Sequence, residues 1–411
     1  MTPTSTSRLR SLIGRETTAG ILILLAAVLG LALANSPASG GFLAATDLRI
    51  GPSALHLDLT LGEWVQDGLL AVFFLVVGIE LAQELTVGSL SRPRQAAVPM
   101  IAAVGGMAMP AAIFVGVVHA SGAGGLAHGW AIPTATDIAF ASAVLALFGR
   151  GLPGALRTFL LTLAIVDDLL GILVIAVFYS GGIAWAALAG ACAAIAAFAW
   201  LMRRGRLRPW VVGLAALAAI AAWALMHASG VHATIAGAAL GLTVPPRPIR
   251  GEAVSRATRL DRALRPWSNV VVLPLFALVA AGVPMSAAGM AGQPVTWAVI
   301  AALVVGKPLG VLVTTWTVTR WTRLRLPDSV GMRDLLPIGL LCGIGFTVSM
   351  LIAGLSFPDT ALVDDARTAV LVGSAVSAGL GALLLHRDAR RARGLDMNED
   401  GTPDRDRRVI R

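Results

Sequence analysis

Successive apolar runs, each about as long as a membrane-spanning helix, make up most of this chain. Of its 411 residues, 56% are hydrophobic and 13% are charged, whereas soluble domains carry roughly 25% charged residues. A helix that crosses the hydrocarbon core of a bilayer needs about 20 mostly apolar residues. We therefore predict an all-α polytopic membrane protein with 12 transmembrane helices. The predicted spans are 18–35, 64–86, 96–119, 128–148, 156–179, 182–202, 210–227, 231–244, 268–285, 295–318, 335–356 and 367–386.

These runs divide the chain into three parts. Residues 1–17 form an N-terminal segment, 18–386 form the 12-helix domain, and 387–411 form a charged tail. The first apolar run is long enough to span a membrane and lacks a convincing cleavage pattern, so we expect it to stay attached. The tail has few apolar residues, which predicts disorder.

Arginines fill alternate loops, and this pattern accounts for the formal net charge of +9. The opposite loops hold almost none, apart from Arg49 and Arg367. By the positive-inside rule the arginine-rich loops and both termini face the cytoplasm, as an even number of spans requires. The charge is therefore typical of membrane orientation and not of nucleic-acid binding.

Three smaller features carry little chemistry. The outer stretch 48–57 contains Gly51-Pro52 between short strand-like flanks, which suits either a small β-hairpin or a plain loop. Cys192 and Cys342 both lie in apolar runs, where cysteine usually acts as a small buried hydrophobe. We predict no disulfide, resident metal or cofactor.

Several ionisable residues lie inside the apolar runs. Such groups cost at least a few kcal/mol in the hydrocarbon core, so they usually face the protein interior and mark a transport path. One of them is the only lysine of the chain, because every other basic residue is arginine. The set is Asp67, Glu80, Glu84, Asp137, Asp167, Asp168 and Lys307.

Asp167 and Asp168 are adjacent in the middle of the fifth predicted span. Neighbouring helix residues point about 100° apart, so the two carboxylates should have different partners. One can bind a small cation, which prefers oxygen ligands, while the other pairs with Lys307. A buried lysine can lose its proton, whereas arginine stays charged. The alternative is that the two acids only hold helices together.

Two spans contain candidate breaks. Pro133 and hydroxyl residues including Thr136 interrupt span 4, and Gly339, Gly343 and Gly345 interrupt span 11. Non-helical backbone at membrane depth requires protein or a cavity around it, although glycines also permit close helix packing. The breaks fall at corresponding places in spans 3–5 and 10–12, which run in opposite directions. This pattern predicts an inverted-repeat transporter fold with two discontinuous helices.

Glu80 and Glu84 are four residues apart and share one helix face near the cytoplasmic end of span 2. They suit a funnel that attracts cations. A solvated helix end is the other interpretation.

The chain resembles the NhaA family of sodium/proton antiporters from Arg15 to about His386. The matching strings are AVFFLVVGIE at 71–80, PTATDIAF at 133–140, LAIVDD at 163–168, GVHAT at 230–234, GKPLG at 306–310 and LCGIGFT at 341–347.

The resemblance implies a role for each central residue. Asp168 would be the principal carrier of cations and protons, with Asp167 close by and paired with Lys307. Asp137 and Thr136 would lie where the two broken helices cross, with Asp137 neutralising facing helix N-termini.

The resemblance also implies roles outside the centre. Glu80, Glu84 and Asp261 would belong to the cytoplasmic funnel and pH response, Asp67 would be an outer acid, and His232 would be linked to pH response or be structural. The chain departs from the family at Ala82 and Gln83, where a basic pair is usual, and at Arg262 and Arg265, where histidines are common.

These features together predict a secondary antiporter of the bacterial inner membrane. It would exchange cytoplasmic Na+ or Li+ for external H+, with pH regulation and net charge movement, and Asp167 and Asp168 would hold Na+ transiently. Its partners would be these ions and the lipid bilayer, and no nucleic acid. The family resemblance also implies a homodimer, with the outer hairpin as its candidate contact.

Other classes fit less well. An intramembrane aspartyl protease, the one enzyme considered, needs two carboxylates on facing helices, whereas the main pair here is adjacent on one helix. A sodium-coupled symporter for an organic anion and a passive cation channel remain as rivals. Lys307 near an acid pair favours proton exchange over symport, and repeated pore-ring motifs are absent from the sequence.

Overall fold

The computed structural model describes residues 16–52, 57–204, 208–285, 292–390, 396–398, 404 and 408–410. These residues are mostly helical and fall into two compact units. The described part of the first unit runs over 22–91 and 172–282, and that of the second over 16–21, 92–171 and 283–410. Helices α2 and α8 each contribute residues to both units.

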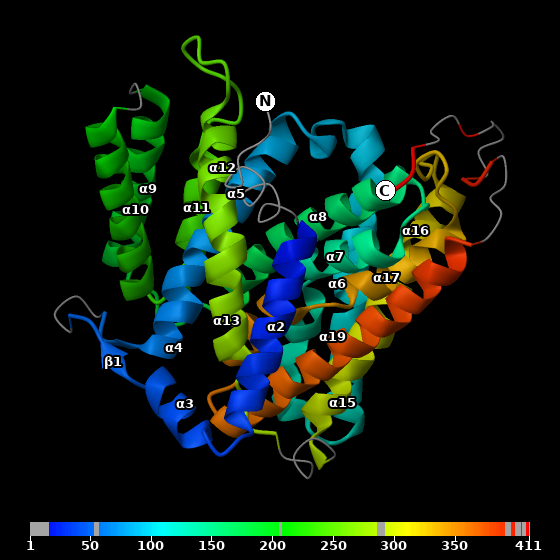
Figure 1. Cartoon of the computed structure of the whole chain (residues 1–411), viewed down its shortest axis with the longest axis horizontal. Helices are drawn as coiled ribbons and strands as arrows, with labels where there is room; N and C mark the ends of the chain where they lie inside the picture. The colour runs from blue at the N-terminus through cyan, green and yellow to red at the C-terminus, as the bar shows by residue number, and fades with distance from the viewer. Residues whose placement is uncertain are drawn as a thin grey trace, which may run out of the picture. The chain divides into compact units, whose positions relative to one another are not determined.

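The first unit contains paired helices (Figure 1). Helices α9 and α10 lie side by side, and α11 packs against α5. Its elements are α2 (Glu16–Ala34, from Leu22), α3 (Ser39–Thr46), β1 (Arg49–Ile50), β2 (Leu59–Thr60), α4 (Leu61–Glu63), η2 (Trp64–Leu69), α5 (Leu70–Thr86), η3 (Ser89–Ser91), the end of α8, α9 (Trp185–Arg204), α10 (Pro209–Ala228), α11 (Thr234–Thr243), α12 (Arg256–Trp267), η5 (Ser268–Val272) and α13 (Leu273–Ala280).

Glycines let α5 and α11 approach each other closely. A Cβ atom on Gly237 would overlap the backbone oxygen of Ala71, and one on Gly241 would overlap that of Leu75. Apolar side chains gain little by moving from lipid into the protein interior, so helices in a membrane associate through such close backbone packing.

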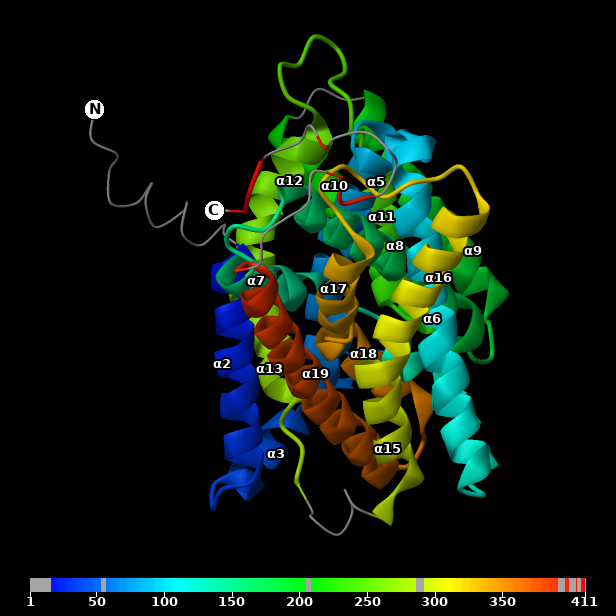
Figure 2. The same cartoon turned by 90° about the vertical axis from the view of Figure 1, so that its right-hand side faces the viewer.

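The second unit holds most of the residues singled out from the sequence. Helix α16 packs along α6, as Figure 2 shows, and α15, α17 and α18 each contact α19. Its elements are α6 (Pro93–Ala120), η4 (Gly124–Thr134), α7 (Ile138–Phe148), α8 (Gly154–Phe178), α15 (Pro294–Ala301), η6 (Ala302–Gly306), α16 (Lys307–Trp321), η7 (Met332–Asp334), α17 (Leu335–Cys342), α18 (Phe346–Ser356) and α19 (Thr360–Asp388).

The described residues contain 8 helices that are long and apolar enough to cross a membrane, or up to 11 if each bent pair forms one span. The chain is therefore a multi-pass membrane protein. Helix α11 is shorter, with 10 residues, so the count of 12 spans stays a prediction. Two of the bent pairs are η4 with α7, at 53°, and α17 with α18, at 49°.

Some helices begin earlier than the apolar runs predict. A span was expected from 268, yet α12 begins at Arg256, and α19 begins at Thr360 where 367 was expected. Both starts are capped, because the Ser255 hydroxyl accepts from the Thr258 amide and the Asp359 carboxylate accepts from the Ala361 amide. Such caps satisfy free backbone N–H groups and let a helix begin in polar sequence.

The outer stretch forms a hairpin, with its second strand later than expected. Arg49 pairs with Thr60 and Ile50 with Leu59 in antiparallel register, so the second strand lies beyond the stretch 48–57. The Leu57 amide donates to the Pro52 oxygen, which widens the connection beyond a tight Gly-Pro turn. Positions 53–56 of that stretch lie outside the described residues, as does the predicted segment 1–15.

The α5–α11 packing predicts a stability difference between two glycine substitutions. Gly237→Ala should lower the stability of the protein in detergent by about 1–3 kcal/mol, because the added methyl group forces the helix backbones apart. Gly213→Ala in α10 is the matched control, since a Cβ there meets nothing within 4 Å. Thermal unfolding of both purified variants tests this, and equal transition temperatures would contradict the packing described.

Candidate functional site

A buried ion pair lies at the centre of the second unit. Lys307 Nζ, at the start of α16, lies 2.5 Å from Asp167 Oδ2 on α8. Both side chains are 0% exposed. The ammonium also donates to the Thr136 hydroxyl at 3.1 Å. Two charges removed from water cost several kcal/mol each, so such a pair needs close geometry and further hydrogen bonds.

Thr136 joins this pair to the break between α17 and α18. Its Oγ1 lies 2.6 Å from Asp167 Oδ2 and 2.9 Å from the backbone oxygen of Cys342, the last residue of α17. A hydroxyl has one hydrogen, so it donates to one of these oxygens at a time. The break between η4 and α7 therefore contacts the other helix break through one side chain.

One carboxylate oxygen in this cluster is unsatisfied. Asp167 Oδ1 is buried and has no hydrogen-bond partner among the described residues. A buried acceptor without a partner costs free energy, which a proton or a bound cation at this oxygen would offset. The cluster is thus able to take up positive charge.

Asp137 caps two helices with one buried carboxylate. Its Oδ1 accepts from the Phe140 amide at 3.0 Å in the first turn of α7, and its Oδ2 accepts from the Thr347 amide at 3.3 Å in the first turn of α18. Its own amide donates to the Ile344 oxygen at 2.6 Å. A negative charge at a helix N-terminus is favourable because the free N–H groups there carry partial positive charge.

The local backbone holds Lys307 in place. The π-helical segment η6 ends immediately before it, and π-helical insertions often occur at functional sites. A Cβ on Gly306 would lie 2.8 Å from the Pro110 Cα, and one on Gly310 would overlap the Gly105 oxygen. The helix that carries Lys307 is therefore pressed against α6 by glycines on both sides of the lysine.

Asp168 follows Asp167 on α8 and is 4% exposed, so both carboxylates lie inside the second unit. Because helix geometry separates adjacent side chains by about 100°, Asp168 points to different surroundings from those of Asp167.

No pattern in the sequence had indicated Ser374 on α19, whose hydroxyl accepts from the Gly345 amide at 3.2 Å. Its only signal was a hydroxyl residue within an apolar helix.

Glu80 and Asp261 meet at Arg265 in the first unit. Arg265 donates to Glu80 Oε2 at 3.0 Å and to Asp261 Oδ1 at 2.9 Å. The guanidinium thus links α5 to α12. From the sequence, Arg265 was only a departure from the family. A second link between α5 and α12 was also missed, in which the Gln83 side-chain amide donates to the Thr258 hydroxyl at 3.1 Å.

Glu84 does not join that group. Its Oε2 accepts from both the amide and the hydroxyl of Ser89, at 2.7 and 2.8 Å. The carboxylate therefore turns back to the segment that follows α5.

Asp67 and His232 form a separate group, also in the first unit. His232 Nε2 lies 3.6 Å from Asp67 Oδ1, and His227 Nδ1 lies 3.9 Å from Asp67 Oδ2. Trp223 donates its indole N–H to the Asp67 backbone oxygen at 3.0 Å. The structure thus places His232, which the resemblance linked to pH response or to a structural role, beside the outer acid Asp67. His227 was not singled out at all.

No metal cage is present in the part of the chain that the structure describes. Groups of three or more His, Cys, Asp or Glu side chains that could hold a metal ion are absent there. Cys192 and Cys342 are both free thiols, the first exposed and the second buried.

Comparison with known proteins gives consistent matches along the chain. The sequence model of a family described as Na+/H+ antiporter 1 matches residues 10–385. The chain is 48% identical to the Na+/H+ antiporter NhaA of Mycolicibacterium smegmatis, over 97% of this chain and 93% of that protein. It is 46% identical to Na+/H+ antiporter NhaA 2 of Kineococcus radiotolerans and 45% identical to the NhaA of Bifidobacterium adolescentis, with 97% and 96% of this chain covered and 90% and 89% of those proteins.

The buried ion pair predicts non-additive stability effects. Lys307→Met should destabilise the protein by about 3–5 kcal/mol, because it leaves the Asp167 charge buried without its partner. Asp167→Asn in the same background should recover most of that loss. Arg320→Met, at an exposed position of the same helix, is the control and should change little. Thermal unfolding in detergent of wild type, the two single core variants, the double variant and the control measures the coupling. Additive effects of the two core substitutions would contradict it.

Proposed function

This chain belongs to the NhaA family of Na+/H+ antiporters, and from that premise we propose how its buried acids exchange the two ions. The membership confirms the resemblance seen in the sequence motifs. The observation that carries the proposal is the buried cluster of Lys307, Asp167 and Thr136, with one carboxylate oxygen left unsatisfied.

Na+ and H+ compete for the same carboxylates. When Asp168 has lost its proton and Asp167 is ionised, a dehydrated Na+ or Li+ can bind through their oxygens, which small cations prefer as ligands. Protonation removes the negative charge and releases the ion. Because a proton and a Na+ ion need the same carboxylate oxygens, occupancy by one ion excludes the other.

Lys307 couples the protons to the ion. While the site is empty of Na+, its ammonium compensates the Asp167 charge. A bound cation competes for that carboxylate and favours loss of a proton from the lysine. If Lys307 and Asp168 each release a proton for every univalent ion, exchange moves net charge. Their titrations are coupled, so the protons belong to the group as a whole.

Asp137 and Thr136 make the crossing of the helix breaks tolerable. The Asp137 carboxylate offsets the partial positive charges at the starts of α7 and α18. We propose that these bent pairs are the discontinuous spans 4 and 11 of an inverted-repeat transporter, in which irregular backbone surrounds a midplane site.

We also propose how the protein lies in the membrane. It has 12 spans, with α11 as the short one, lies in the bacterial inner membrane and keeps both termini in the cytoplasm, as the arginine distribution favours. The β1–β2 hairpin is the candidate contact of a homodimer. The domain limits remain those inferred from the sequence, with helices over 18–386.

Glu80 and Asp261 lie on the entry route for cytoplasmic cations, and Asp67 with His232 lies on the outer side. In many relatives histidines are expected near Asp261, and a histidine charge changes near neutral pH. Arg265 is instead charged at all physiological pH values. We infer that the link between α5 and α12 is permanent here, so pH regulation depends on the central acids.

Ion exchange is tested directly in proteoliposomes with an acidic interior. Adding Na+ or Li+ outside should dequench a pH dye in wild type, and Asp168→Asn should abolish the response. Asp47→Asn, at an exposed position, should respond like wild type. Absence of any wild-type response between about pH 6.5 and 9 would reject antiport and leave the sodium-coupled symporter as the alternative, since symport of Na+ with an organic anion needs no proton exchange.

The permanent link at Arg265 predicts the effect of a titratable replacement. Arg265→His should make the transport rate depend on a group that titrates near pH 6.5, because only the protonated imidazole can bridge Glu80 and Asp261. Arg262→His, one turn earlier and exposed, is the control. Transport rates measured over pH 5.5–8.5 in roughly half-unit steps would show this. Identical profiles for the two variants would contradict it.

A further inference from the structure

The loop between α7 and α8 offers a backbone edge on which the C-terminal segment is seated. The Gly151 amide donates to the Ile410 oxygen at 2.9 Å, and the Ile410 amide donates to the Leu152 oxygen at 2.8 Å. The Gly154 amide donates to the Arg408 oxygen at 2.8 Å. These bonds form an antiparallel bridge like that of a strand added to a sheet edge.

Side chains of the segment alternate as in a strand with one buried face. Ile410 is 8% exposed, whereas the neighbouring Val409 is 54% exposed. Leu152, in the loop beneath, is 1% exposed. Burial of one isoleucine adds an apolar anchor to the backbone hydrogen bonds, and a charge at that position would oppose it.

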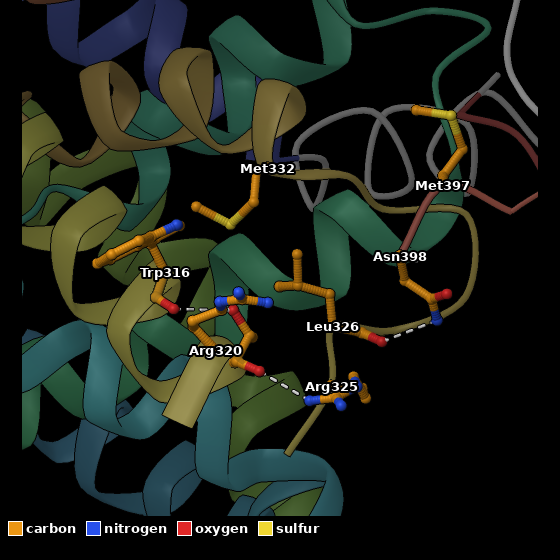
Figure 3. Close-up of a pocket in the computed structure, with 8 residues that line it drawn as sticks. Trp316, Arg320, Arg325, Leu326, Met332, Met397 and Asn398 are labelled. Atoms are coloured by element: carbon orange, nitrogen blue, oxygen red, sulfur yellow. Dashed lines mark hydrogen bonds between the residues drawn. The ribbon is translucent and has the colours of Figure 1, made fainter. Parts of the chain in front are cut away.

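A second contact attaches the tail to the loop after α16. The side-chain amide of Asn398 donates to the backbone oxygen of Leu326 at 3.2 Å. Within the tail, the backbone amide of Met397 donates to the Asp404 carboxylate at 2.9 Å. Figure 3 shows Met397 and Asn398 on one side of a cavity of about 220 Å³, with Trp316 and other residues of the α16 end on the other. The tail residues are therefore part of the cavity wall.

We propose that residues 151–154 are a docking surface for the segment 408–410. This segment and residues 397–398, which contact two different loops of the second unit, are together called the strap. One loop leads into α8, which carries Asp167 and Asp168, and the other follows α16, which begins with Lys307. By fixing one end of each helix, the strap holds the ion pair in register. This last step, its effect on ion affinity, rests on the proposed function.

Amide hydrogen exchange on the full-length protein in nanodiscs tests the docking. Removal of residues 408–411 should raise exchange at Gly151 and Gly154 by about tenfold or more, because their acceptors are lost. Ile410→Asp should do the same. Val409→Asp adds the same charge one residue earlier, on the exposed side, and should keep the protection. Unchanged protection after the truncation would overturn the strap.

The effect on transport is measured with the same variants in proteoliposomes. Truncation and Ile410→Asp should raise the Na+ concentration for half-maximal exchange by about threefold or more, while Val409→Asp should match wild type. Lost protection with unchanged Na+ dependence would overturn the coupling and leave the docking supported. Because amide exchange requires no transport, failure of the antiporter proposal would be recognised separately, by an inactive wild type.

Discussion

The buried contact between the Lys307 ammonium and the Asp167 carboxylate is the constraint on which the rest of the second unit depends. Two charges that are fully withdrawn from water are stable only at close range and with further hydrogen bonds. Thr136 supplies such a bond, and it reaches Asp167 because the chain is not helical between Thr134 and Ile138. The ion pair and the helix break therefore belong to one arrangement.

That break has its own requirements, which other residues meet. Two helices begin at the breaks, and the Asp137 carboxylate accepts a hydrogen bond from a backbone N–H group of each. The backbone oxygen of Cys342 faces Thr136, and Ser374 accepts from the Gly345 amide. Polar backbone inside a membrane protein must find partners within the protein, and here short side chains provide them.

The remaining unsatisfied oxygen gives the site its chemistry. Asp167 Oδ1 is buried without a partner among the described residues, beside the ion pair that Oδ2 forms with the Lys307 ammonium. A site of this kind gains by taking up positive charge as a proton or as a small cation. We therefore propose that a single buried group of residues exchanges one for the other.

The sequence predicted this centre well because charge inside an apolar run is rare and therefore informative. Asp167, Lys307 and Thr136, which the apolar pattern and the motifs had indicated, do meet in the structure. Long apolar helices were also predicted. Two of them begin earlier than predicted, because Ser255 and Asp359 cap their first turns.

Other features depend on tertiary contacts that no local pattern records. Arg265 bridges two acids from different helices, and His232 meets Asp67 across a long stretch of sequence. Disorder of the C-terminal tail was predicted from its composition, and it stays a prediction for the many tail residues that lie outside the described ones. The described segment Arg408–Ile410 pairs with a loop more than 250 residues earlier. Composition reports average polarity, whereas one buried isoleucine and three backbone hydrogen bonds are enough to seat a short segment.

Na+ and H+ are proposed to compete for one group of carboxylates, and proton release on ion binding measures this competition most directly. Purified protein in weakly buffered detergent solution is mixed with Na+ or Li+ while the pH is recorded. We predict that ion binding releases protons at a pH where the site is protonated, and that Asp168→Asn abolishes the release. Saturable Na+ binding that releases no protons at any pH would contradict the account.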